Sequence, residues 1–81
     1  MREQPVTVLK AGDKARVVAI AGQDAGYIRK LTVFGLLPGA DIEVMQTFPA
    51  YVLSIGNTQL ALDREIATGI IVVKCQQDKK K

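Results

Sequence analysis

Leu37-Pro38-Gly39-Ala40 gives the strongest local structural signal in this sequence. Proline presets φ at the second position of a type II turn, and glycine accepts the positive φ that the third position requires. The residues after the turn alternate in polarity, with Ile42 and Val44 on one face and Glu43 on the other. This alternation predicts a strand over residues 41–48, after which a proline-containing segment reverses the chain.

Further short elements are predicted downstream of this strand. Tyr51–Ile55 and Thr58–Leu62 are two strands, and the Gly56-Asn57 loop between them favours a type II′ or type I′ hairpin. Asp63 can cap one helical turn in a segment that is too short to form a stable helix by itself. Four consecutive β-branched residues at 70–73 then predict a last strand that is covered on both faces.

A strand and a helix are predicted upstream of the turn. A segment at 10–13 that contains Gly and Asp precedes a strand over Lys14–Ile20, which is rich in β-branched residues. Asp24 is a suitable N-cap for a helix that reaches residue 33 or 34, and Gly35 is suited to end it in a left-handed conformation. The apolar residues at helical spacing in this segment are Tyr27, Ile28, Leu31 and Phe34.

The order of these elements predicts a single, mainly β domain over residues 6–75. The chain has 81 residues, enough for one small domain, and 48% of them are hydrophobic. About five short antiparallel strands can bury their apolar faces by curling into a small barrel, which also protects the sheet edges. We therefore expect an SH3-like barrel with a short helix inserted after its first strand, and a disordered basic tail over residues 76–81.

The net charge of +3 comes from the lysines at 79–81, so the body of the domain is expected to be neutral. A nucleic-acid-binding protein needs a basic stripe on a folded face, because contacts with phosphates supply most of its affinity. Residues 12–22 are similar to the first strand of the small barrels in ribosomal and transcription-elongation proteins, but any SH3-like barrel needs this pattern. Nucleic-acid binding therefore stays an alternative that the charge distribution disfavours.

Residues that could carry catalysis or hold a metal are few. The sequence has no histidine, a single serine, Ser54, and a single cysteine, Cys75. It therefore lacks the usual general base, an intramolecular disulfide and a structural zinc site. Two local pairs of carboxylates exist, but neither offers three converging ligands: Asp41 with Glu43, and Asp63 with Glu65. We predict a protein that binds a partner, is not an enzyme, and has no cofactor or metal of its own.

The apolar residues around the end of the helix are more than so small a barrel can bury. They are Phe34, Leu36 and Leu37, with Tyr51 and Val52 further along. A contiguous exposed patch of this kind marks a protein-contact surface, whereas a helix that folds back would cover it. Both alternatives stay open, although Tyr51 follows a proline-containing turn and is expected to be an exposed amphipathic residue.

The location expected from the sequence is the cytoplasm. No apolar run approaches the roughly 20 residues that a membrane-spanning helix needs. The first residues also lack the pattern of a basic segment followed by an apolar one that is typical of a secretory signal.

Several motifs, in order, resemble those of the FeoA family. IRKLTVFGLLPGADIEV at 28–44 is similar to the family's basic-rich helix, its Pro-Gly turn and the Ile-x-Val strand that follows. QLALDREIA at 59–67 resembles the family's Leu-Ala-Leu-Arg-x-x-Glu-Ala segment. The first and last predicted strands fall in the corresponding places, so the resemblance covers about residues 6–75. The sequence departs from the family pattern at Phe34 (usually Met or Leu), at 50–52 (often a polar turn) and at Asp63 (commonly Arg).

The resemblance implies a small cytoplasmic SH3-like protein that accompanies the FeoB-type ferrous iron transporter, a membrane protein with a GTPase domain. Such proteins are thought to bind or modulate the transporter, which would itself handle the iron, and no catalysis is attributed to the family. A generic SH3-like interaction module, related to the C-terminal domain of iron-dependent repressors, is the alternative. The residues that the resemblance places on the partner-binding face are Arg29, Leu31, Phe34, Leu36, Pro38 and Gly39.

Overall fold

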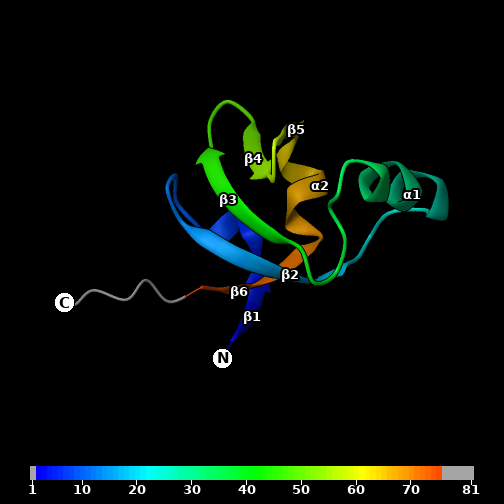
Figure 1. Cartoon of the computed structure of the whole chain (residues 1–81), viewed down its shortest axis with the longest axis horizontal. Coiled ribbons are helices and arrows are strands. Elements are labelled where there is room, and N and C mark those ends of the chain that lie inside the picture. The colour runs from blue at the N-terminus through cyan, green and yellow to red at the C-terminus, as the bar shows by residue number, and fades with distance from the viewer. Residues whose placement is uncertain (1, 76–81) are drawn as a thin grey trace.

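The computed structural model describes residues 2–75, so the predicted tail at 76–81 lies outside the described residues. One antiparallel sheet and two α-helices make up this part of the chain (Figure 1). The elements are β1 (Glu3–Pro5), the 3-10 helix η1 (Val6–Val8), β2 (Lys14–Ile20), α1 (Ala25–Val33), β3 (Asp41–Gln46), β4 (Tyr51–Ile55), β5 (Thr58–Leu62), α2 (Arg64–Thr68) and β6 (Ile70–Lys74).

The sheet has six strands in the order β1-β6-β2-β3-β4-β5. Each strand pairs antiparallel with its neighbours, so the predicted mainly β, antiparallel class is confirmed. Within residues 2–75, β1 and β5 are the two ends of this order and no ladder joins them. Closure of the sheet into a barrel is therefore not confirmed by strand pairing.

Strand β1 is an element that the sequence did not predict. Glu3 pairs with Val73, and Pro5 pairs with Ile71, so β1 covers the outer edge of β6. A proline has no N–H to give to a ladder and is tolerated only at a sheet edge, which is the position that β1 occupies. The short, proline-containing segment is a strand because β6 offers it a partner, rather than because of its own composition.

Strand β3 is shorter than predicted, since it ends at Gln46 instead of residue 48. The register shifts between Val44 and Gln46, and Gln46 then pairs with Val52 on β4. Pro49, in the turn that follows, has no N–H to donate and cannot extend the ladder. The end of β3 is therefore set by an irregularity in pairing that alternation alone does not reveal.

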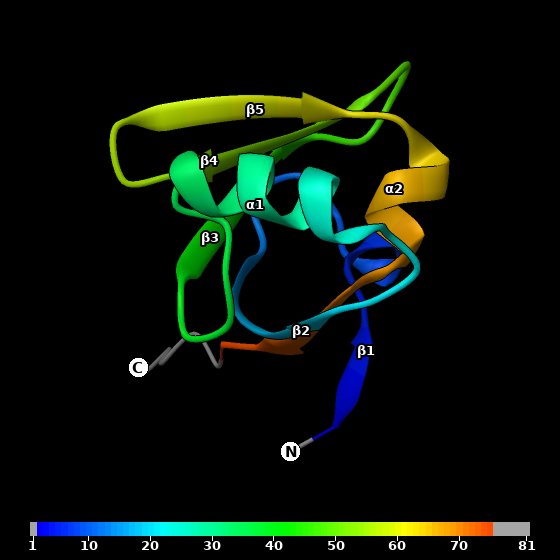
Figure 2. The ribbon, with the colours of Figure 1, turned by 90° about the vertical axis from the view of Figure 1, so that its right-hand side faces the viewer.

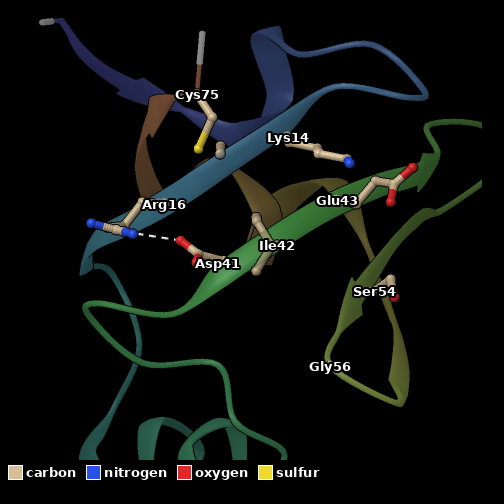
Figure 3. A pocket seen from close by; sticks show the side chains of 9 residues that line it. Lys14, Arg16, Asp41, Ile42, Glu43, Ser54, Gly56 and Cys75 are labelled. Atoms are coloured by element: carbon tan, nitrogen blue, oxygen red, sulfur yellow. Dashed lines mark hydrogen bonds and ion pairs between the residues drawn. The ribbon is translucent and has the colours of Figure 1, made fainter. Parts of the chain in front are cut away.

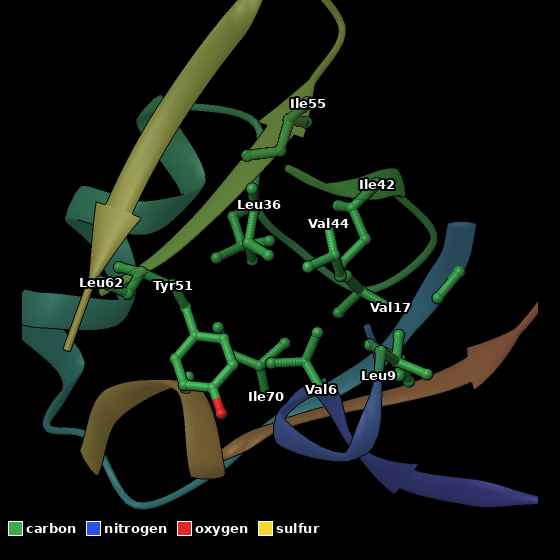
Figure 4. Close-up of a cluster of buried hydrophobic side chains, with 14 of the residues drawn as sticks. Val6, Leu9, Val17, Leu36, Ile42, Val44, Tyr51, Ile55, Leu62 and Ile70 are labelled. Carbon is green, nitrogen blue, oxygen red and sulfur yellow. The ribbon is translucent and has the colours of Figure 1, made fainter. Parts of the chain in front are cut away.

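The core lies on the inner faces of the curled sheet (Figure 4). Val17, Val44, Leu53 and Val72 come from four different strands, and each is at most 1% exposed. In β6 the inner residues are buried while the outer ones are half-buried, so the coverage predicted for both faces is complete only on the inner face. Burial of apolar area at about 25 cal/mol per Å² supplies most of the stability of such a core.

Tyr51 is part of this core, and the expectation that it is exposed was wrong. Its side chain is 4% exposed, and its hydroxyl oxygen accepts a hydrogen bond of 3.0 Å from Nη1 of Arg64 at the start of α2. The bond satisfies the polar end of the ring, which allows the rest of the side chain to be buried. The proline-containing turn before Tyr51 thus precedes an inward-facing residue.

Candidate partner-binding surface

The turn at 37–40 has the geometry that the sequence predicts. Gly39 has φ +96°, and the N–H of Ala40 donates to the carbonyl oxygen of Leu37 at 3.0 Å. Two further hydrogen bonds join the turn to β2: the N–H of Gly39 donates to Val17 O at 2.8 Å, and the N–H of Val17 donates to Ala40 O at 2.9 Å. The turn is therefore fixed to the sheet on both sides of Gly39.

Helix α1 lies to one side of the sheet (Figure 1), with its outer side toward the viewer in Figure 2. It begins as predicted at Asp24, whose Oδ1 accepts a hydrogen bond of 2.8 Å from the N–H of Tyr27. It ends before Gly35, which has φ +94°. Leu31, 1% exposed, is its buried residue, and the N–H of the buried Leu36 donates to Leu31 O at 3.0 Å.

The structure divides the apolar residues at the end of α1 into two groups. Leu36 is fully buried, whereas Phe34 is 42% exposed and Leu37 is 37% exposed. Val33 is exposed more than either, at 78%. Of the two alternatives that the sequence left open, coverage therefore holds for Leu36 and Tyr51, and exposure holds for Phe34 and Leu37.

The residues assigned to the partner-binding face divide in the same way. Arg29, Phe34, Pro38 and Gly39 are exposed, whereas Leu31 and Leu36 belong to the core and offer no surface for contact. Val33 was missed, although an apolar residue off the buried stripe of an amphipathic helix is a signal that could have found it. We call the exposed set the α1–turn surface, and its members are Arg29, Lys30, Val33, Phe34, Leu37, Pro38 and Gly39.

The charge of the α1–turn surface is positive. Arg29 and Lys30 are exposed, and the sequence contains no acidic residue from 25 to 40. Lys30 Nζ lies 6.0 Å from the ring centroid of Tyr27, at the outer limit of a cation–π contact. The salt bridges formed within residues 2–75 lie elsewhere, between Arg16 and Asp41 and between Lys74 and Asp13.

A separate hollow of about 360 Å³ opens beside β2, β3 and β4 (Figure 3). Arg16 Nε and Asp41 Oδ1 form an ion pair of 2.9 Å in its wall. The hydrogen bond from Arg16, followed by its charge, lowers the pKa of Asp41, and the same contact raises the pKa of Arg16. Ser54 and Cys75 also line the hollow, and the sequence has no histidine that could act as a general base there.

Residues 2–75 contain neither a metal-binding cluster nor a membrane-spanning helix. Within residues 2–75, no group of three or more His, Cys, Asp or Glu side chains is arranged to hold a metal ion. Over the same residues, neither helix has the length and apolar character that crossing a membrane requires.

The arrangement defines a class of protein: a small SH3-like domain that carries exposed apolar and basic side chains on an inserted helix and turn. IdeR from T. acidophilum has this fold, with a TM-score of 0.83 at 21% identity over 93% of this chain and 35% of that chain. At this level of identity the likeness shows the fold alone.

The chain belongs to the FeoA family. The profile of the FeoA domain matches residues 4–74, which confirms the resemblance found in the sequence. A crystal structure described as an iron uptake regulatory protein (FeoA) is 31% identical, with a TM-score of 0.80 over 93% of this chain and 100% of that chain. The FeoA protein from Chlorobium tepidum is 29% identical, with a TM-score of 0.84 over 94% and 74%. No protein of curated function matches the sequence.

Proposed function

We propose that this chain is a cytoplasmic accessory protein of bacterial ferrous iron uptake, which binds and modulates an FeoB-type membrane GTPase transporter. Membership of the FeoA family carries the proposal, since this is a family of accessory, non-catalytic domains linked to ferrous iron transport. The protein acts by binding rather than by catalysis, and the iron is the cargo of its partner.

The exposed members of the α1–turn surface make the contact in this proposal. The family resemblance places six residues on the partner-binding face, and those that are accessible are Arg29, Phe34, Pro38 and Gly39. Leu31 and Leu36 hold the surface in place from the core. A surface fixed by backbone hydrogen bonds before binding loses little conformational entropy when the complex forms, which favours its use as a contact site.

The test is an isothermal titration of this chain into the cytoplasmic, GTPase-bearing part of the FeoB-type transporter from the same source. We expect saturable binding that Phe34→Ser weakens, because an apolar side chain at an interface contributes through burial. Phe48→Ser is the matched control, since Phe48 is an exposed phenylalanine, 85% accessible, outside the α1–turn surface. An absence of binding by the wild-type chain, with its fold intact, would contradict the proposal.

A second candidate is an interaction module that serves a regulatory protein. The fold likeness to the metal-dependent repressors favours it, since a manganese-dependent transcriptional repressor matches with a TM-score of 0.82 at 18% identity over 42% of that chain. Binding of this chain to the remaining part of such a repressor, and not to the transporter, is the result that would select this candidate.

A further inference from the structure

The outward side of α1 carries apolar and basic side chains next to each other. Residues three and four apart are neighbours on a helix surface, so Arg29 lies beside Val33, and Lys30 lies beside both Val33 and Phe34. Leu37 follows in the turn that β2 holds in place. A single exposed apolar residue needs no explanation, but three that are close in the chain and bordered by two positive charges form a distinct surface.

The two positive charges are available to a partner. Neither Arg29 nor Lys30 takes part in an ion pair within residues 2–75. Asp24 is the nearest acidic residue in the sequence, and its carboxylate already accepts the capping hydrogen bond at the other end of the helix. By contrast, Arg16 is paired to Asp41 in the hollow on the sheet. Within residues 2–75, no carboxylate therefore forms an ion pair with the basic side chains of α1.

A protein segment fits this surface better than a lipid bilayer does. Near an anionic membrane a single Lys or Arg contributes only a modest attraction, and Arg29 with Lys30 supplies two such contributions. Val33, Phe34 and Leu37 together are smaller than the apolar face of a membrane-surface helix, which runs along the whole helix. Against a protein, the same side chains can fill a pocket while carboxylates around its rim meet the two cations, which gives affinity and orientation.

We propose that the α1–turn surface binds an acidic amphipathic segment of its protein partner: apolar side chains on this segment pack against Val33, Phe34 and Leu37, and carboxylates beside them pair with Arg29 and Lys30. The inference rests on the proposed function and specifies the chemistry of the partner at that site. Electrostatic complementarity of this kind raises the association rate and makes binding sensitive to salt.

The experiment measures the Kd for the cytoplasmic, GTPase-bearing part of the transporter at low and at high salt, with the wild-type chain and with three variants. The double variant Arg29→Glu/Lys30→Glu is expected to bind at least about tenfold more weakly at low salt and to lose most of the salt dependence. Val33→Ser is expected to weaken binding by about three- to tenfold at both salt concentrations, because it removes an apolar contact. Lys10→Glu is the control: Lys10 is exposed, basic and distant in sequence, and its reversal should change the Kd by less than about twofold.

The outcomes separate this inference from the proposed function. If the wild-type chain binds and the double variant binds equally well, the inference is wrong while the proposed function stands. If the wild-type chain does not bind at all, both fall. Sedimentation with vesicles of equal parts phosphatidylglycerol and phosphatidylcholine provides the third outcome: binding to vesicles that the double variant loses, without binding to the protein, would replace the acidic segment by an anionic lipid surface. The substituted side chains are exposed, so circular dichroism and thermal unfolding should show an unchanged fold.

Discussion

Helices α1 and α2 begin in the same way and are used differently. Each has an aspartate N-cap whose Oδ1 accepts from the backbone three residues later, Asp24 from Tyr27 at 2.8 Å and Asp63 from Ile66 at 2.9 Å. The shorter helix, α2, contacts η1 and β6, whereas the longer α1 stands to one side of the sheet. The length of a helix therefore does not determine how extensively it packs against the rest of the domain. The short helix closes the core, and the long one presents a surface.

The glycines at the two helix ends differ in the same sense. Gly35, after α1, has φ +94°, so glycine is favoured there by backbone conformation. Gly69, after α2, has φ −85°, which any residue can adopt, but a Cβ at this position would collide with the carbonyl oxygen of Ala21. One glycine allows the chain to turn, and the other allows two backbone segments to approach.

Gly69→Ala should destabilise the protein more than any other substitution considered below. The N–H of Ala21 donates to Gly69 O at 2.7 Å. This hydrogen bond holds Ala21 in place, and the new Cβ would collide with the carbonyl oxygen of the same residue. Because backbone must move, we expect a loss of about 3–4 kcal/mol in the free energy of unfolding, measured by urea denaturation. Gly39→Ala is the control, with a positive φ but open space around the Cβ, and it should cost about 1 kcal/mol. Equal losses for the two variants would contradict the close approach at α2.

The next effect tests how α1 is held. Leu31 is its buried residue, and Leu31→Ala should lower the free energy of unfolding by about 2–3 kcal/mol, since it leaves a cavity under the helix. Val33→Ala, at a position that is 78% exposed, should change it by less than about 0.5 kcal/mol. If the two variants were equally stable in urea, α1 would not be packed through Leu31 and the comparison of the helices would fail.

Removal of the two helix caps should have a smaller effect, and it tests whether α1 and α2 are coupled differently to the sheet. Asp24→Ala and Asp63→Ala each remove one capping hydrogen bond and should each cost about 1 kcal/mol. Their reach should differ when amide hydrogen exchange is followed residue by residue. Loss of the Asp24 cap should speed exchange within α1 alone, whereas loss of the Asp63 cap should also speed exchange in η1 and β6, which α2 contacts. If the Asp63→Ala variant showed faster exchange only within α2, this result would argue against a role of α2 in closing the core.

The smallest effect concerns Asp41, the first residue of β3. The hydrogen bond from Arg16 lowers the folded-state pKa of Asp41. The contribution of the pair to stability is therefore present above the ordinary carboxyl pKa and lost as the pH falls through the lowered one. Asp41→Asn should lower the thermal midpoint slightly at neutral pH and not at all below that pKa, because exposed pairs contribute little. A difference that grows on acidification would have the wrong sign for this pair.

Features decided by neighbours in the chain could be predicted from the sequence. The turn at 37–40, the two aspartate caps and the end of α1 at Gly35 each depend on a few adjacent residues, and all were confirmed. At the hairpin the structure selects between two predicted alternatives. Gly56 has φ +58° while Asn57 does not have a positive φ, as a type II′ turn requires.

Features decided by distant partners could not be predicted. Strand β1 exists because β6 pairs with it, although their residues lie far apart in the sequence. Tyr51 is buried because Arg64 satisfies its hydroxyl from α2. In the candidate site, Leu36 and Leu37 are adjacent and chemically alike, yet one is buried and the other is exposed. The difference follows from how the chain leaves α1, which composition does not encode.

The two hydrogen bonds between Val17 and the turn have a consequence for the lengths that the connecting segments can tolerate. Gly39 and Ala40 must reach Val17 from the end of α1, so inserted residues between α1 and β3 would displace both bonds. On the other side of the helix, Gly22 and Gln23 form no backbone hydrogen bond outside the regular elements with any residue from 2 to 75. Exposed segments without such bonds accept insertions best. Related chains should therefore vary in length before α1 and keep a constant length after it.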